Sequence, residues 1–165
     1  MTAKLGSAAT AKALERLSGP TGVTAGLAAL SQGGGDPAGT PASVSIRAQN
    51  VAADLAERTG PVQYPAVNIY CQRLVNDLKE KFRHFSGKAV LAAEIRHSQD
   101  RLDGLETTLQ LCADAVAQAL DGSRGDWGDG MYYAGGYEVA FGAVKHGGRN
   151  FLQSATVTFA VEVSK

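Results

Sequence analysis

The chain has 165 residues, of which 44% are hydrophobic and 19% are charged, and its formal net charge is zero. This length allows one compact domain with a sizeable core and an appendage. The balanced charge argues against a protein that binds nucleic acid over its whole surface, although a few Lys and Arg side chains can still gather on one face.

The first 41 residues are predicted to form a helical extension that ends in a linker. Two Ala-rich stretches, residues 8–17 and 23–30, favour helices, and Gly19-Pro20 separates them. Because most of their apolar side chains are Ala, neither helix would be stable alone, and we expect both to pack on the rest of the domain or on another copy. The Gly- and Pro-rich residues 33–41 predict a loop.

Residues 42–165 are predicted to form an α+β domain. Apolar side chains at helical spacing predict a helix over residues 44–58. Alternating apolar and polar residues predict strands at 67–71 and 89–96. We expect the charged segment 74–85 between them to be a turn or a short extension of a strand.

The strongest helical signal follows these strands. Asp100 or Asp103 is expected to cap the helix, and Gly122 is expected to end it. Its apolar side chains have the four- and three-residue spacing of one helical face, and they are Leu105, Leu109, Cys112, Val116 and Leu120.

Two further strands are predicted over residues 137–143 and 155–163. The short segment 145–150 between them favours an antiparallel hairpin. The predicted fold is therefore α+β, with a four-stranded, mostly antiparallel sheet of two hairpins. Helices pack on one face of this sheet, and the helical N-terminal extension is added to it.

The cysteines and the N-terminus indicate a cytosol-like compartment. Cys71 and Cys112 show neither CxxC nor Cys/His spacing, so we expect no zinc site and two reduced, partly buried thiols. Residues 1–17 carry four charges, which argues against a signal peptide. Glycines and a proline interrupt the charge-poor residues 17–32, so no membrane-spanning helix is expected there.

No pattern of residues predicts an enzyme, a cofactor or a metal site. The three histidines, His84, His97 and His146, lie in no metal-binding or nucleophile-activating motif, and we expect them to be solvated or hydrogen-bonded. Neither cysteine lies in a Gly-rich turn or beside a histidine, which argues against a catalytic thiolate.

The segment 121–130 is the most unusual in the chain. It holds three carboxylates, but their spacing differs from that of an EF-hand. We interpret it as a helix-to-strand loop that is anchored by a tryptophan. The alternative is a contact between subunits, because Trp and Arg are common in interfaces. The candidate contact residues are Arg124, Asp126, Trp127 and Asp129.

The predicted hairpin tip at 145–150 is a second candidate surface. Its basic side chains and two glycines can cradle a phosphate or contact a negatively charged neighbour. A solubilising turn is the more ordinary interpretation. The candidate residues are Lys145, His146 and Arg149.

A family resemblance rests on residues 87–106 (GKAVLAAEIRHSQDRLDGLE), on residues 135–139 (GGYEV) and on residues 151–163. With these segments, residues 44–165 resemble the tail-terminator (tail-completion) proteins and related neck proteins of long-tailed bacteriophages. The resemblance implies an α+β protein that forms a ring, commonly a hexamer, at the head-proximal end of the tail tube. Residues 1–41 exceed the core fold of that family.

The resemblance also implies partners and a location. Such a ring ends tube polymerisation and joins the tail to the head connector, so its partners are further copies of itself, the tail-tube protein and the connector or stopper proteins. Genomic DNA passes through its lumen only transiently, and no membrane takes part. The location is the virion, and the host cytoplasm during assembly. The last predicted strand offers an edge for pairing with the next copy.

Other functions stay open at this point. Within the same class, the chain can be a head-completion or stopper protein of the neck. From other classes, it can be a small ligand-binding or enzymatic α+β domain, which needs a pocket with convergent polar groups, or a DNA-binding factor, which needs strong and salt-dependent affinity.

Overall fold

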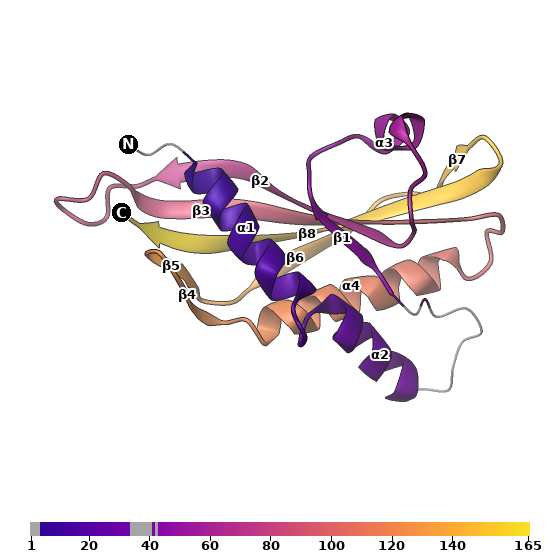
Figure 1. Cartoon of the computed structure of the whole chain (residues 1–165), viewed down its shortest axis with the longest axis horizontal. Helices are drawn as coiled ribbons and strands as arrows, with labels where there is room; N and C mark the ends of the chain where they lie inside the picture. Colours follow the sequence, from indigo (N-terminus) through magenta and orange to yellow (C-terminus); the bar gives the residue numbers. More distant parts are fainter. Residues whose placement is uncertain (1–3, 34–40, 42) are drawn as a thin grey trace.

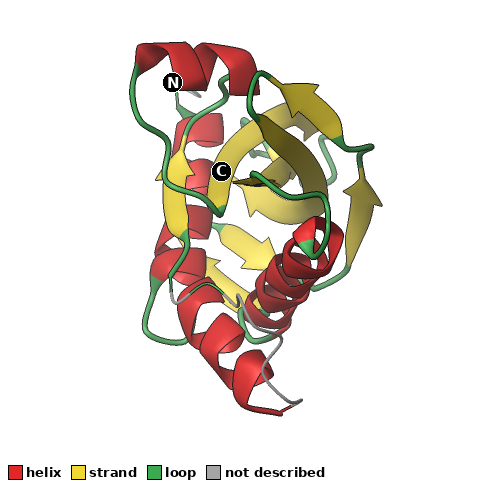
Figure 2. Ribbon diagram, turned by 90° about the vertical axis from the view of Figure 1, so that its right-hand side faces the viewer, coloured by secondary structure: helices red, strands yellow, loops and turns green. Residues whose placement is uncertain are grey.

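The computed structural model describes residues 4–33, 41 and 43–165, which form one curled sheet with helices packed against it (Figures 1 and 2). The helices are α1 (Leu5–Ser18), α2 (Val23–Gly33), α3 (Ala53–Thr59) and α4 (Leu105–Asp121). The strands are β1 (Ser45–Ala48), β2 (Ala66–Asn76), β3 (Ser86–Gln99), β4 (Gly125–Gly128), β5 (Met131–Tyr133), β6 (Tyr137–Phe141), β7 (Lys145–Gly147) and β8 (Asn150–Ser164).

Three long antiparallel strands, β2, β3 and β8, form the centre of the sheet. β3 pairs with β8 over its whole length, from Ser86 opposite Ser164 to Gln99 opposite Phe151. On one side, β1 lies parallel to β2. On the other side, β8 pairs in turn with β7, β6 and β5, and β4 extends the sheet beyond β5. The strands β5, β6 and β7 therefore act as one interrupted strand along β8.

The predicted four-stranded sheet of two hairpins is wrong, because eight strands form one mixed sheet. The predicted strand pairs exist as β2–β3 and β6–β8, but the long β3–β8 pair joins them into one sheet. The missed strands β1, β4, β5 and β7 have only three or four residues each, too few for an alternating pattern to be recognised. Gly135 and Gly136, with φ of 98° and 90°, break the edge between β5 and β6.

The helix predicted from the apolar stripe is confirmed as α4. All five residues of the stripe are fully buried, and the helix packs on β3 and β8. The predicted caps are wrong, since Gly104 precedes the helix and no side chain caps its first turn. Gly122 ends the helix as expected, and its N–H donates a hydrogen bond to the Gln118 carbonyl at 3.0 Å.

The N-terminal helices belong to the same core as the sheet and are not a separate extension. α1 buries a stripe of small and apolar side chains, and it lies across β1 and β2. α2 buries Val23 and Leu27 and packs on α4. A Cβ atom at Gly26 would lie 3.5 Å from the Ala115 carbonyl oxygen, an ordinary contact distance, so Gly26 faces α4 across the contact between the two helices. The domain itself therefore supplies the neighbour that these helices need.

The helix predicted over residues 44–58 is wrong. Ser45–Ala48 instead form β1, which pairs with the start of β2, and only Ala53–Thr59 are helical, as α3. No residue of α3 is buried, and Leu55 is 51% exposed. The apolar spacing at 48, 51, 52 and 55 thus suggested a helical face that never meets the core, and pairing with β2 overrides it.

The strands β2 and β3 extend further than predicted and form a long hairpin. β2 continues to Asn76 and β3 begins at Ser86, which leaves residues 77–85 as the tip. Figure 1 shows this tip projecting from one end of the sheet. The Oδ1 atom of Asn76 accepts hydrogen bonds from the backbone N–H groups of Leu78 and Ser86, which fixes the base of the tip.

Candidate assembly surfaces

The strand β6 is an open edge of the sheet. No other strand pairs with its outer side in the part of the chain that the structure describes. Tyr137, Val139 and Phe141 point to the face that α1 and α4 cover, here called the helix face, because their partners on β8 are buried there. Tyr137 is 40% and Phe141 48% exposed. The edge therefore presents a row of apolar side chains on the helix face, and Glu138 lies exposed on the opposite face.

The strand β1 is the open edge on the other side of the sheet, and among residues 4–33, 41 and 43–165 only β2 pairs with it. Ile46 and Ala48 share the helix face, and the exposed Arg47 points to the opposite face, because its partner on β2 does so. An apolar groove of about 490 Å³ lies beside this edge, between α1 and the strands. Its walls include Thr10, Ala11, Leu14, Ala48, Ile69 and Cys71.

The tip of the β2–β3 hairpin is a third exposed surface. Leu78 is 64% and Phe82 fully exposed, and both have positive φ, at 47° and 69°. Glu80 steadies the tip, since its carboxylate accepts a hydrogen bond from the Ser164 hydroxyl at 2.8 Å and lies 3.5 Å from the guanidinium of Arg83. Large apolar side chains in solvent at the end of a projecting hairpin suit contact with a partner.

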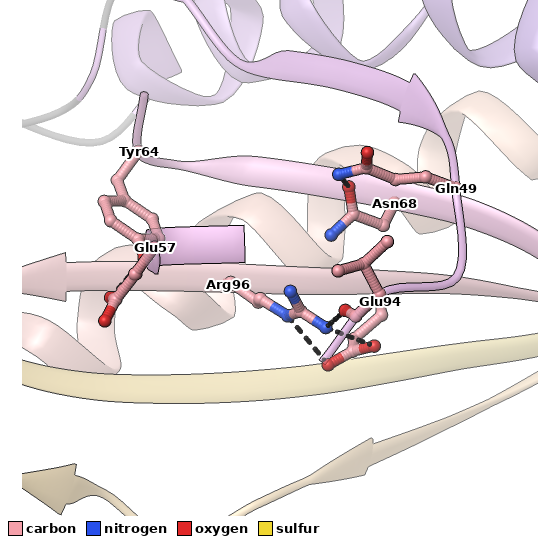
Figure 3. Close-up of polar contacts among 7 residues, drawn as sticks. Gln49, Glu57, Tyr64, Asn68, Glu94 and Arg96 are labelled. Carbon is pink, nitrogen blue, oxygen red and sulfur yellow. Dashed lines mark hydrogen bonds and ion pairs between the residues drawn. The ribbon is translucent and has the colours of Figure 1, made fainter. Parts of the chain in front are cut away.

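Residues 49–65 form an arch over the opposite face of the sheet, and a buried arginine ties this arch down (Figure 3). Arg96 is 4% exposed. Its Nε and Nη2 atoms donate to the two carboxylate oxygens of Glu94 at 2.9 and 3.1 Å, and Nη2 also donates to the Val51 carbonyl. Glu94 therefore balances the charge of Arg96, and the pair links the arch to β3.

Further polar contacts hold the arch, and two cavities lie beneath it. The Gln49 amide donates to Asn68 at 2.9 Å, and the Tyr64 hydroxyl donates to Glu57 at 2.7 Å. Burial and the hydrogen bond to Glu57 raise the pKa of Tyr64, so its hydroxyl stays protonated. The cavities have volumes of about 290 and 570 Å³, and Arg96 lies in the wall of both.

Trp127, a predicted contact residue, lies inside the core. It is 3% exposed, and its Nε1–H donates to the Ser123 carbonyl at 2.7 Å. Its ring packs against Tyr133 and Phe159, with centroid distances of 5.5 and 6.4 Å. Trp127 therefore anchors the segment 121–130 and offers no surface to a neighbouring copy.

The other predicted contact residues of this segment are exposed but bonded within the chain. Arg124 forms an ion pair with Asp121 at 3.0 Å. Asp126 accepts a hydrogen bond from the backbone of its own turn at 2.8 Å. Asp129 lies 3.7 Å from the ammonium group of Lys12, which ties the segment to α1.

Lys145, His146 and Arg149 lie exposed in the β7–β8 hairpin, as the predicted hairpin tip requires. His146 packs on Phe151, with a centroid distance of 5.2 Å, and Lys145 and His146 also line the larger cavity beside Arg96. Lys145 pairs with Leu152 of β8, and Met131, which directly follows the segment 121–130, pairs with Val163, eleven residues further along the same strand. At the usual rise of a strand this is roughly 37 Å, so the structure keeps the two predicted contact surfaces far apart.

Both cysteines are free, with Cys112 buried and Cys71 half-buried. Burial raises the pKa of Cys112 to about 12 and also raises that of Cys71. Both thiols therefore stay protonated near neutral pH and are weak nucleophiles. In the described ranges, no three His, Cys, Asp or Glu side chains lie close enough together to hold a metal ion. No helix among the described residues has the length and hydropathy to cross a membrane.

Comparison with protein-family models gives no match, and comparison with curated proteins gives no significant match. The surfaces must therefore be judged on their geometry. The sequence analysis missed the two open edges, which carry Arg47 and Glu138, and the projecting tip of the β2–β3 hairpin. The sequence did carry one signal of the β6 edge. The pair Gly135-Gly136 stands before an alternating run, and such a pair marks the start of a new strand. Nothing in the sequence marks Arg47 as an edge residue.

Proposed function

We propose that this protein forms a ring at the head-proximal end of a long-tailed phage tail, where it ends tail-tube polymerisation and joins the tail to the head connector. One observation carries this proposal: the sheet has unlike open edges on its two sides, with β1 on one side and β6, next to the outer strands β4 and β7, on the other. The resemblance of residues 44–165 to tail-terminator proteins supports the same role.

Two unlike edges favour a head-to-tail contact between copies. An unpaired strand is a template for another strand, and a contact that joins two different surfaces produces a closed ring when the rotation between copies closes. The sheet is strongly curled (Figure 2), so edge-to-edge addition rotates each copy relative to the last. Such rotation favours a closed ring over a flat stack.

The surfaces outside the two edges suit the further partners of a tail terminator. Leu78 and Phe82, on the projecting tip, supply an apolar contact for the tail-tube protein or the head connector. Two of the exposed cations, Lys145 and Arg149 in the β7–β8 hairpin, are candidates for the lumen. A net-neutral chain binds DNA weakly, which suits a passage through which the genome slides.

The test uses the purified full chain, first alone and then with tail tubes or portal-bearing heads of its own phage. We expect closed rings by negative-stain microscopy, binding to tube ends, and shorter tubes when the protein is present during polymerisation. Binding to portal-bearing heads but not to tubes would instead indicate a stopper protein. A monomer that binds neither structure would contradict the proposal.

A variant separates the two kinds of contact. The double substitution Leu78→Ser and Phe82→Ser removes the apolar side chains of the tip, which lies away from both edges of the sheet. We expect this variant to form rings as before and to lose binding to tube ends or to the connector. Unchanged binding would remove the tip from the proposed contacts.

A further inference from the structure

We infer that β6 of one copy pairs antiparallel with β1 of the next copy, with Glu138 opposite Arg47, so that the sheet continues from subunit to subunit. This inference rests on the proposed ring and specifies its interface. Three independent features of the two edges support it: their free backbone groups, their side chains on each face, and the apolar groove beside β1.

The backbone of β6 leaves alternate residues free for a partner. The Gly142 N–H donates to the Ser154 carbonyl at 2.8 Å, and this residue pair continues the register of β6 with β8. In an antiparallel ladder, bonded and non-bonded pairs alternate. Residues 138 and 140 therefore bond to β8, and the N–H and C=O groups of Tyr137, Val139 and Phe141 point outward.

The backbone of β1 leaves the complementary set free. The Ser45 N–H donates to the Pro65 carbonyl at 3.0 Å, in the parallel register that places Ser45 beside Ala66. Because successive residues of a strand point their backbone groups to opposite sides, Ser45 and Arg47 bond to β2. The N–H and C=O groups of Ile46 and Ala48 point outward and are available to another strand.

The antiparallel register that we infer places Ile46 opposite Val139 and Ala48 opposite Tyr137, so that each outward backbone group of β1 meets an outward group of β6. In this register Arg47 lies directly opposite Glu138, and both side chains are exposed on the face opposite the helix face. Opposite charges at directly opposed positions stabilise a strand pair.

The helix face of the same register is apolar. Ile46, Ala48, Tyr137 and Val139 all lie on that face, as does Phe141 beyond them. Ala48, the partner of Tyr137, also lines the groove of about 490 Å³ between α1 and the strands. The exposed ring of Tyr137 therefore enters an apolar groove of the neighbouring copy, which removes both surfaces from water.

The charges also disfavour the symmetric alternatives. Two β1 edges that pair around a twofold axis bring Arg47 against its own copy, and two β6 edges bring two Glu138 carboxylates onto one face. Like charges across a strand pair are destabilising. The head-to-tail pairing of β6 with β1 avoids both contacts, and such pairing gives a closed ring when the rotation between copies closes.

Charge reversal gives the direct test. We expect Glu138→Arg alone and Arg47→Glu alone to weaken association by roughly tenfold at each interface at low salt, because each places like charges opposite one another. An equimolar mixture of the two variants should recover ring formation, because alternating copies restore an Arg–Glu pair at every interface. The double variant should recover it without mixing. Asp114→Arg, on the exposed side of α4, is the matched control and should leave the rings unchanged.

Cross-linking gives a second, independent readout on the full chain. Directly opposed residues of a non-bonded pair have Cα atoms about 4.5 Å apart, within the range of a disulfide. The double variant Arg47→Cys and Glu138→Cys, oxidised with copper–phenanthroline, should therefore give a ladder of covalent oligomers on a non-reducing gel. Each single cysteine variant should give no ladder.

The outcomes separate this inference from the proposed function. Rings that form equally well in both charge-reversed variants, with no ladder after oxidation, would overturn the β6–β1 pairing and leave the tail-terminator role standing. A wild-type chain that forms no ring, alone or on tail tubes, would overturn the proposed function itself. Failure of the mixture to recover association would also contradict the head-to-tail register.

Discussion

The centre of the sheet and the edge made by β5, β6 and β7 both pair with β8, yet they differ in almost every other respect. The β3–β8 pair is unbroken, and its side chains on the helix face are buried. The edge is broken at Gly135-Gly136 and again at Gly142, and the aromatic side chains of β6 are exposed. The centre thus determines the fold, and the edge keeps free the backbone and apolar groups that the proposed ring contact would use.

Two phenylalanines on the same face of the sheet test this contrast most strongly. Phe159 is 3% exposed and packs against Trp127 and Tyr133, and Phe141 is 48% exposed on β6. Phe159→Ala should lower the free energy of unfolding by about 3–5 kcal/mol, because it leaves a cavity in the core. Phe141→Ala should change it by less than about 0.5 kcal/mol, because the side chain is half in solvent.

Urea unfolding followed by fluorescence measures both effects, since Trp127 is the only tryptophan and lies in the core. In the proposed ring, Phe141→Ala should also weaken association without loss of monomer stability. Equal destabilisation by the two substitutions would show that the edge is as tightly packed as the centre, contrary to the comparison.

The ion pair beneath the arch gives the next largest expected effect. Arg96→Met removes the partner of Glu94 and the bond to the Val51 carbonyl, so we expect a loss of about 2–3 kcal/mol in the free energy of unfolding. The double variant Arg96→Met and Glu94→Met should recover most of this loss, because no unpaired carboxylate is left beneath the arch. Urea denaturation of the three proteins gives the comparison.

The matched control is the exposed ion pair at the other end of the molecule. Arg124 and Asp121 are 59% and 46% exposed in their side chains. Arg124→Met should therefore change the free energy of unfolding by less than about 0.5 kcal/mol. A loss at Arg124 as large as that at Arg96 would mean that burial of the ion pair does not determine its contribution.

The same contrast explains which parts of the fold the sequence predicts. The helix α4 and the strands β2, β3 and β8 carry long periodic patterns because each buries one complete face, so their existence was predictable. The strand β1 was not, because four residues hold too short a pattern and its pairing with β2 is a tertiary event. The interrupted edge escaped prediction for the same reason, since pairing with β8 alone unites β5, β6 and β7.

The candidate contacts show a similar limit. Residue type correctly drew attention to Lys145 and Arg149, because basic residues at a glycine-rich turn are almost always exposed. For Trp127, the favoured interpretation as an anchor is confirmed and the alternative of a contact is not, because its indole N–H donates to a buried carbonyl and its ring fills the core. The open edges depend on which strands pair, and that information lies in the whole fold and not in any local segment.

The smallest expected effect concerns pH and the pair formed by a half-buried histidine and a buried glutamine at one end of the central strands. His97 and Gln153 are cross-strand partners on β3 and β8, and in the described part of the chain neither His97 Nδ1 nor Gln153 Oε1 has a hydrogen-bond partner. Burial lowers the pKa of His97 below its usual value near 6.5, and a hydrogen bond with Gln99 opposes this in part.

The direction of the pH effect follows from proton binding. Just below pH 6.5 the unfolded chain binds more protons at this histidine than the folded protein, so the free energy of unfolding falls as the pH decreases through that range and is unaffected above it. His97→Gln should remove this contribution, which is measured as the difference between wild type and variant in urea unfolding at about pH 7.5 and about pH 5.5. Carboxylates contribute equally to both proteins and cancel in that difference, and the exposed His146→Gln serves as the matched control. A wild type and a His97→Gln variant with parallel pH profiles would show that the centre of the sheet tolerates a charge at this position, which its burial argues against.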